Sequence, residues 1–77
     1  MKNKFKEVFV ELLQIRGISA YKFSADTGIS QGSLSEWKNG IKTPSAESLI
    51  TIADYFDVSV DYLLGRTDKI EWVKKHD

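Results

Sequence analysis

The feature that most constrains the fold of this chain is a break at Gly28 between two helix-like segments. The segment before it, residues 20–27, reads AYKFSADT, and the chain restarts at Ser30, whose hydroxyl can cap the free N–H groups of a new helix. Helices commonly end in a left-handed residue, which glycine adopts without a Cβ clash. The stretch therefore predicts two short helices joined by a tight turn.

Apolar residues in this stretch predict how the two helices pack. Phe23 and Thr27 lie four residues apart and share one face of the first helix. Leu34 and Trp37, three residues apart, form the inner stripe of the second helix, and Ile29 points inward from the turn. The two helices should therefore meet on one common core.

The opposite face of the second helix carries no bulky apolar side chain. The major groove of B-DNA admits one α-helix, and Gln and Asn are matched to the paired acceptor and donor of adenine. In a helix-turn-helix, the N-terminal part of the second helix meets the base edges. The residues on or beside this polar face are Gln31, Gly32, Ser33, Ser35, Glu36 and Asn39.

The segments SLSEWKNGIKTPS and IADYFDVSVDYLLG carry a family resemblance. Together with the turn glycine they resemble the lambda-repressor-like, Cro-type (XRE) helix-turn-helix family of small bacterial and phage regulators, over roughly residues 5–68. The resemblance implies a sequence-specific regulator, a repressor by default, that binds a double-stranded DNA operator as a homodimer. Residues 30–39 of each subunit would enter successive major grooves about 34 Å apart.

Site residues follow from the resemblance and from the polar face together. The expected base contacts are Gln31, Gly32, Ser35 and Glu36. The expected phosphate contacts, which position the protein without reading sequence, are Ser19, Tyr21, Lys22, Ser33, Lys38, Asn39 and Lys42. The alternative for the phosphate contacts is a solvated surface, above all for Lys38, whose direction around the helix is closer to the core side.

The sequence gives specific expectations for three residues of the helix that starts at Ser30. Gln31 is expected to pair bidentately with adenine. Glu36 has three interpretations: it accepts from a cytosine amino group, it excludes wrong sequences, or it pairs with a nearby lysine. Gly32 either allows close approach of the backbone to DNA or is a tolerated surface position near a helix start.

Two positions depart from the family pattern. The residue after the capping serine of the second helix is often a phosphate-clamping glutamine, and here it is Ala20. An arginine often found near the end of the first helix corresponds to Leu13. Both changes remove contacts to DNA, so Tyr21 or Lys22 is expected to contribute instead.

Periodicity and caps elsewhere predict an all-α, compact five-helix bundle that contains the helix-turn-helix. Besides the two helices above, helices are expected over about residues 3–16, from Ser45 with Glu47 in its first turn, and from Ser59; the helix that starts at Ser30 should end at Gly40. Residues 1–68 form the expected DNA-binding domain, and 69–77 a tail or short helix. The expected core residues outside residues 20–39 are Phe5, Val8, Phe9, Leu12, Leu13, Leu49, Ile52, Ala53, Phe56, Leu63 and Leu64.

Charge and composition narrow the function classes. The net charge is zero, but residues 1–42 hold seven basic against four acidic residues (+3), and residues 43–68 hold one against five (−4). No cysteine is present, and no apolar run approaches the roughly 20 residues that cross a membrane, so a cytoplasmic protein is expected. The one histidine, His76, has no partner at a ligand spacing, so no enzyme, metal or cofactor is expected.

Two other functions stay open on the sequence. The domain is alternatively the DNA-binding antitoxin of a toxin–antitoxin pair, with a protein toxin on the tail and acidic face. It is also compatible with a protein-interaction module that kept the fold and lost DNA binding, which the zero net charge and Ala20 leave open.

Overall fold

Residues 4–66, which the computed structural model describes, form five helices and no strand, and this confirms the predicted all-α, five-helix architecture. The expected start of the first helix at Asn3 and the expected tail 69–77 lie outside the described residues. The helices are α1 (Phe5–Arg16), α2 (Ala20–Thr27), α3 (Gln31–Lys38), α4 (Ala46–Phe56) and α5 (Val60–Leu63).

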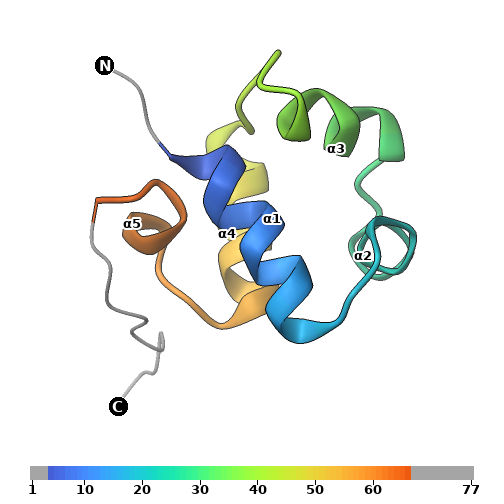
Figure 1. Cartoon of the computed structure of the whole chain (residues 1–77), viewed down its shortest axis with the longest axis horizontal. Coiled ribbons are helices and arrows are strands. Elements are labelled where there is room, and N and C mark those ends of the chain that lie inside the picture. The colour runs from blue at the N-terminus through green and yellow to red at the C-terminus, as the bar shows by residue number, and fades with distance from the viewer. Residues whose placement is uncertain (1–3, 67–77) are drawn as a thin grey trace.

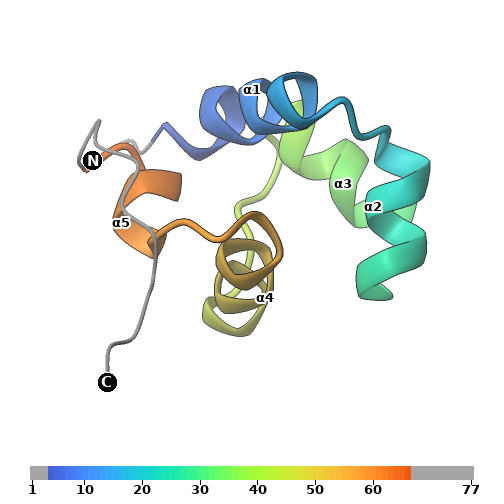
Figure 2. The same cartoon turned by 90° about the horizontal axis from the view of Figure 1, so that it is seen from below.

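Helices α1 and α4 occupy the middle of the molecule, with α2 and α3 on one side and α5 on the other (Figure 1). The view turned by 90° places α1 along one edge and α4 along the opposite edge (Figure 2). Helix α1 packs against α3 and α5, and α2 packs against α3. The two helices of the predicted helix-turn-helix therefore stand at one end of the bundle.

An aromatic cluster centred on Phe9 joins the first four helices. The ring of Phe9 lies 5.3 Å from those of Phe5 and Phe23, 5.9 Å from Trp37 and 6.4 Å from Phe56, measured between centroids. All five side chains are buried, as their spacing predicted. Offset or edge-on aromatic pairs add stability beyond the area they bury. This cluster fixes α3 against α1.

Helix starts follow the predicted serine caps. Each capping hydroxyl accepts a hydrogen bond from the backbone N–H three residues later, at 3.0 to 3.2 Å. These bonds satisfy donors that a helix start would otherwise leave unpaired. The four caps are Ser19, Ser30, Ser45 and Ser59.

Helix α3 runs from Gln31 to Lys38 between its caps Ser30 and Asn39, in agreement with the helix expected over 30–39 and ended by Gly40. Asn39 is its C-cap, and Gly40 has a left-handed φ of 75°. The N–H of Gly40 donates to the carbonyl of Trp37 at 3.1 Å, which tightens the last turn and breaks the α-helical pattern before the glycine. Of the expected core residues, Val8, Leu49 and Leu64 are only partly buried against the cluster.

One long-range contact closes the end of α4. The guanidinium of Arg16, at the end of α1, donates a hydrogen bond to the carbonyl of Phe56 and lies 5.7 Å from its ring centroid. Phe56 is the last residue of α4, where carbonyls lack helical partners and a cation is favoured. None of the five described helices is long and apolar enough to cross a bilayer.

Candidate nucleic-acid interface

Helix α3 is anchored by its apolar side. Leu34 and Trp37 are 1% and 5% exposed, and the Trp37 ring meets those of Phe5 and Phe9 edge-on. Ile29, in the turn before the helix, is partly buried against the same cluster. The polar face of α3 is consequently held outward on a rigid base.

Side chains as well as backbone hold the turn between α2 and α3. The N–H of Gly28 donates to the carbonyl of Ser24 at 2.8 Å, and Gly28 has a left-handed φ of 81°. The Ser24 hydroxyl donates to the carbonyl of Ile29 at 2.6 Å, and the N–H of Ile29 donates to Thr27 Oγ1 at 3.2 Å. Such local bonds from Ser and Thr offer the backbone an alternative to helix. They fix the angle at which α3 leaves α2.

The expected base-reading residues lie together on the outer face of α3. Gln31, Gly32 and Ser35 are exposed, and Glu36 is half-buried. A Cβ added at Gly32 would meet only Ser30 Oγ, at 3.8 Å, which is an ordinary contact. Packing within the protein therefore does not require glycine there.

Two of the expected phosphate contacts on α3 already have local partners. The hydroxyl oxygen of Ser33 accepts from the Ser30 hydroxyl at 3.1 Å, so Ser33 belongs to the capping arrangement. Asn39 Nδ2 donates to Ser35 Oγ at 3.4 Å, a long bond between exposed side chains. Both bonds involve surface groups that can exchange partners when a ligand arrives.

Glu36 faces a lysine, one of the three interpretations of this residue. Its Oε1 lies 3.9 Å from Nζ of Lys42; the side chain of Lys42 is 66% exposed and that of Glu36 is 42% exposed. The N–H of Ile41 donates to the Glu36 carbonyl at 2.9 Å and holds the loop beside the helix. An exposed pair of this kind contributes little stability. The carboxylate therefore remains available to a base.

On α2, the lysine expected to compensate for Ala20 is already paired. Lys22 Nζ lies 3.1 Å from Asp26 Oδ2, which also accepts a hydrogen bond of 2.6 Å from the Tyr55 hydroxyl on α4. The bonds from Tyr55 and then Lys22 lower the pKa of Asp26, and the bond to Asp26 raises the pKa of Tyr55. Tyr21 is 70% exposed.

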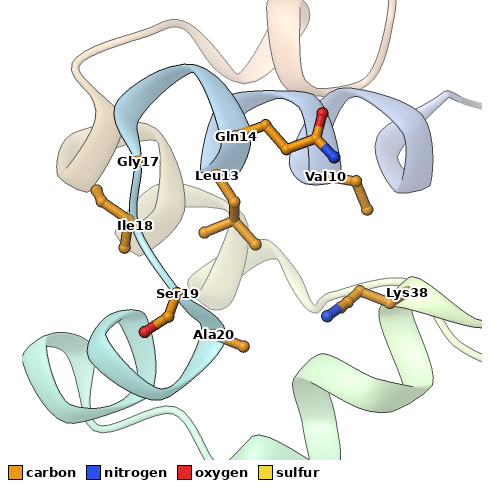
Figure 3. A pocket seen from close by; sticks show the side chains of 8 residues that line it. All are labelled: Val10, Leu13, Gln14, Gly17, Ile18, Ser19, Ala20 and Lys38. Carbon is orange, nitrogen blue, oxygen red and sulfur yellow. The ribbon is translucent and has the colours of Figure 1, made fainter.

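Lys38 is exposed and lies on the side of α3 that faces α1 and the start of α2. It lines one hollow with Gln31, Ser35, Asn39 and Ala20, and a second with residues of α1 and the start of α2. In Figure 3 its ammonium group points toward Leu13 and Ala20. Lys38 thus lies between the polar face of α3 and Ala20 and Leu13, the two positions that depart from the family pattern. Helical spacing predicted this side of α3 for Lys38, but its neighbours on α1 and α2 come from the packing of the helices.

The acidic residues that the structure describes in α4 and α5 do not gather into a metal site. Within residues 4–66, no group of three or more His, Asp or Glu side chains is arranged to hold a metal ion. His76, the one histidine of the sequence, lies outside that range. The described residues offer instead a polar helix face with lysines on both sides.

Comparison with known proteins agrees with this arrangement. The crystal structure of a transcriptional regulator from Listeria innocua is similar to this chain, with a TM-score of 0.77 at 23% identity, over 96% of this chain and 68% of that one. No curated protein sequence matches. A family model described as helix-turn-helix matches residues 11–63, which span α2 and α3 entirely. The chain therefore belongs to the Cro-type helix-turn-helix family of DNA-binding transcriptional regulators, which are not enzymes.

Proposed function

We propose that this chain is a sequence-specific repressor that binds a double-stranded DNA operator as a homodimer in the cytoplasm. Each subunit places α3 in the major groove, and Gln31, Gly32, Ser35 and Glu36 meet base edges. One observation carries this proposal: α3 is locked by Leu34 and Trp37 on one side and presents only short or polar groups on the other. A rigid helix of this kind fits a groove that admits a single helix.

Contacts to the DNA backbone on either side of the groove come from the expected phosphate-contact residues, which are Ser19, Tyr21, Lys22, Ser33, Lys38, Asn39 and Lys42. They carry no sequence information, but they set the register of α3 on the duplex.

Pairing of the surface charges argues for a dimer. Lys22 and Lys42 both lie near carboxylates, at 3.1 and 3.9 Å. The end of the molecule formed by α2 and α3 therefore has less unpaired positive charge than its number of lysines implies. Attraction to phosphates supplies most of the affinity of a single domain for DNA. Two linked domains on two half-sites gain affinity without any new contact. The proposed operator is accordingly two-fold symmetric.

The direct test selects bound duplexes from a random pool and then titrates the winner and scrambled DNA at two salt concentrations. We expect a two-fold-symmetric site with half-site centres one helical turn apart. Binding should fall steeply with salt on both duplexes, while the preference for the selected site persists. Analytical ultracentrifugation of the complex then reports two chains per duplex.

Other outcomes separate the remaining functions. An enriched site without symmetry, bound by one chain, contradicts the homodimer. Absence of any enriched site, with the domain folded, contradicts a sequence-specific regulator and favours a protein partner. Repression itself is tested by a reporter carrying the selected site across its promoter, where a rise in expression would contradict it.

A further inference from the structure

The carboxylate of Asp26 on α2 is held in place by a residue from another helix. The Tyr55 hydroxyl on α4 donates a hydrogen bond of 2.6 Å to Asp26 Oδ2. The Tyr55 ring meets the ring of Phe23 edge-on, at 5.0 Å between centroids, and Phe23 is a fully buried residue of the same helix as Asp26. The ring and the hydroxyl of Tyr55 therefore both contact α2, and they give the Asp26 carboxylate a defined position.

The same carboxylate oxygen pairs with a lysine. Lys22 Nζ lies 3.1 Å from Asp26 Oδ2, and the two side chains are 62% and 36% exposed. An exposed ion pair usually contributes little, because two long side chains must be held in one geometry and water screens their charges. Here Tyr55 already holds the carboxylate, so only Lys22 loses freedom when the pair forms.

The ion pair beside α3 is arranged differently. Glu36 Oε1 and Lys42 Nζ lie 3.9 Å apart, and no side chain within residues 4–66 donates a hydrogen bond to the Glu36 carboxylate. Of these two lysines, Lys22 has the closer and the better fixed carboxylate partner.

Lys22 lies in the first turn of α2, where its backbone N–H donates to the capping Ser19 hydroxyl at 3.0 Å. A DNA phosphate that pairs with the Lys22 ammonium group must replace Asp26, and the negative charge of Asp26 repels that phosphate. Contacts to phosphates form on any sequence, so this competition acts on every duplex alike.

We propose that Asp26, fixed by Tyr55, competes with DNA phosphates for Lys22 and thereby lowers the affinity of each subunit for all DNA. The inference rests on the DNA binding of the proposed function, and it adds a residue that limits this binding. A single subunit then binds random DNA weakly, and two linked subunits on two half-sites reach a useful affinity.

The test measures binding of Asp26→Asn to a random-sequence duplex over a range of salt concentrations. Asp26→Asn should bind more tightly than the unaltered protein at low salt. Its slope of log affinity against log salt should be steeper by up to about 0.9 for each bound subunit, which changes its advantage by about 3.5-fold over a fourfold range of salt. A merely structural role of Asp26 predicts the opposite result, weaker binding without a steeper slope, because the variant loses the contact between α2 and α4.

Three further variants separate the ion pair from the general effect of charge. Glu11→Gln removes one negative charge from the exposed side of α1 and should give a smaller gain in affinity at an unchanged slope. When Asp26→Asn is added to Lys22→Met, the gain should be no larger than that of Glu11→Gln, because the lysine to be released is gone. Tyr55→Phe leaves the carboxylate in place but unfixed, so it should show part of the gain of Asp26→Asn. Circular dichroism checks that each variant folds.

The outcomes distinguish this inference from the proposed function. If folded Asp26→Asn binds random duplexes no more tightly than the unaltered protein, the competition is overturned. A full gain that persists in the Lys22→Met background also overturns it, since the gain would then come from the charge of Asp26 alone. Binding to random duplexes without an enriched site overturns the sequence-specific regulator, but the salt slopes still test Asp26. Failure of both the unaltered protein and Asp26→Asn to bind any duplex overturns both proposals.

Discussion

The Tyr55 hydroxyl on α4 donates a hydrogen bond of 2.6 Å to Asp26 Oδ2 on α2, across 29 positions of sequence. The Tyr55 ring also meets the Phe23 ring edge-on, at 5.0 Å between centroids. This pair braces the first helix of the helix-turn-helix against α4. It thereby helps to set the orientation of the DNA-facing end.

The brace should make stability depend on pH in a predictable direction. Tyr55 and then Lys22 lower the folded-state pKa of Asp26, so its stabilisation is present above the unfolded pKa of about 3.9 and is lost as the pH falls through the folded pKa. The raised pKa of Tyr55 has the opposite sense: its stabilisation is present below the unfolded pKa of about 10 and is lost as the pH rises through the folded pKa.

We therefore expect Asp26→Asn to be less stable than the unaltered protein near neutral pH, with the difference shrinking on acidification below about pH 3.9. Tyr55→Phe should lose part of the same pH dependence. Thermal unfolding followed by circular dichroism across this range measures both. If the stability difference between Asp26→Asn and the unaltered protein were the same at every pH, the hydrogen bond would not depend on the negative charge of Asp26.

Two serine caps of the same geometry allow local stability to be separated from binding. Ser30 accepts from the N–H of Ser33 at 3.1 Å and Ser45 from that of Ser48 at 3.2 Å. Ser30→Ala and Ser45→Ala should each lower the free energy of unfolding by about 0.5–2 kcal/mol. Only Ser30→Ala should also weaken DNA binding, because its cap holds the turn that carries Gln31. Denaturant unfolding and duplex titration of both variants provide the comparison.

Gln31 is expected to read a base and not a phosphate. Gln31→Ala should weaken binding to the selected site by about 1–3 kcal/mol and change binding to scrambled DNA little. The side chain is exposed, so folding should be unaffected. Titration of both duplexes at one salt concentration measures the two losses. Equal losses would mean that Gln31 does not read sequence.

Glu36 is expected to choose between bases. Its carboxylate can only accept hydrogen bonds, which suits the amino group of cytosine, whereas an amide suits adenine. Glu36→Gln should change the preferred base pair at one position of each half-site from C·G toward A·T. Glu11→Gln, the same substitution on the exposed side of α1, is the control and should select the unaltered site. Selection with both variants from a random pool decides the matter; an identical site for Glu36→Gln would contradict base reading.

The substitution Gly32→Ala distinguishes close approach of DNA to the backbone at this residue from a tolerated surface position. The space around it accepts a methyl group, so Gly32→Ala should stabilise the fold by up to about 1 kcal/mol through helix propensity. A lower affinity for the selected duplex together with this higher stability would indicate that DNA approaches the backbone there. Unchanged affinity would identify Gly32 as a tolerated surface position. Thermal unfolding and titration of the one variant give both quantities.

The local elements were predictable because their causes lie within a few residues. The serine caps act on N–H groups three positions away, and Gly28 ends α2 within its own turn. Buried residues such as Phe9, Leu34 and Trp37 follow helical spacing, which the sequence displays directly. Gly40 ends α3 in the same local way, since it follows the C-cap Asn39 in a left-handed conformation and its N–H donates to the carbonyl of Trp37.

By itself the sequence determined five helices, their caps, most of the core and the polar face of α3, since periodicity and capping are short-range effects. Only the tertiary structure decided which surface groups pair with residues far away in the sequence. Tyr55 meets Asp26 and Arg16 meets Phe56 across 29 and 40 positions, and Lys38 comes beside Leu13 and Ala20. These neighbours are set by the way the aromatic cluster packs whole helices together. The spacing of residues along one helix carries no record of them.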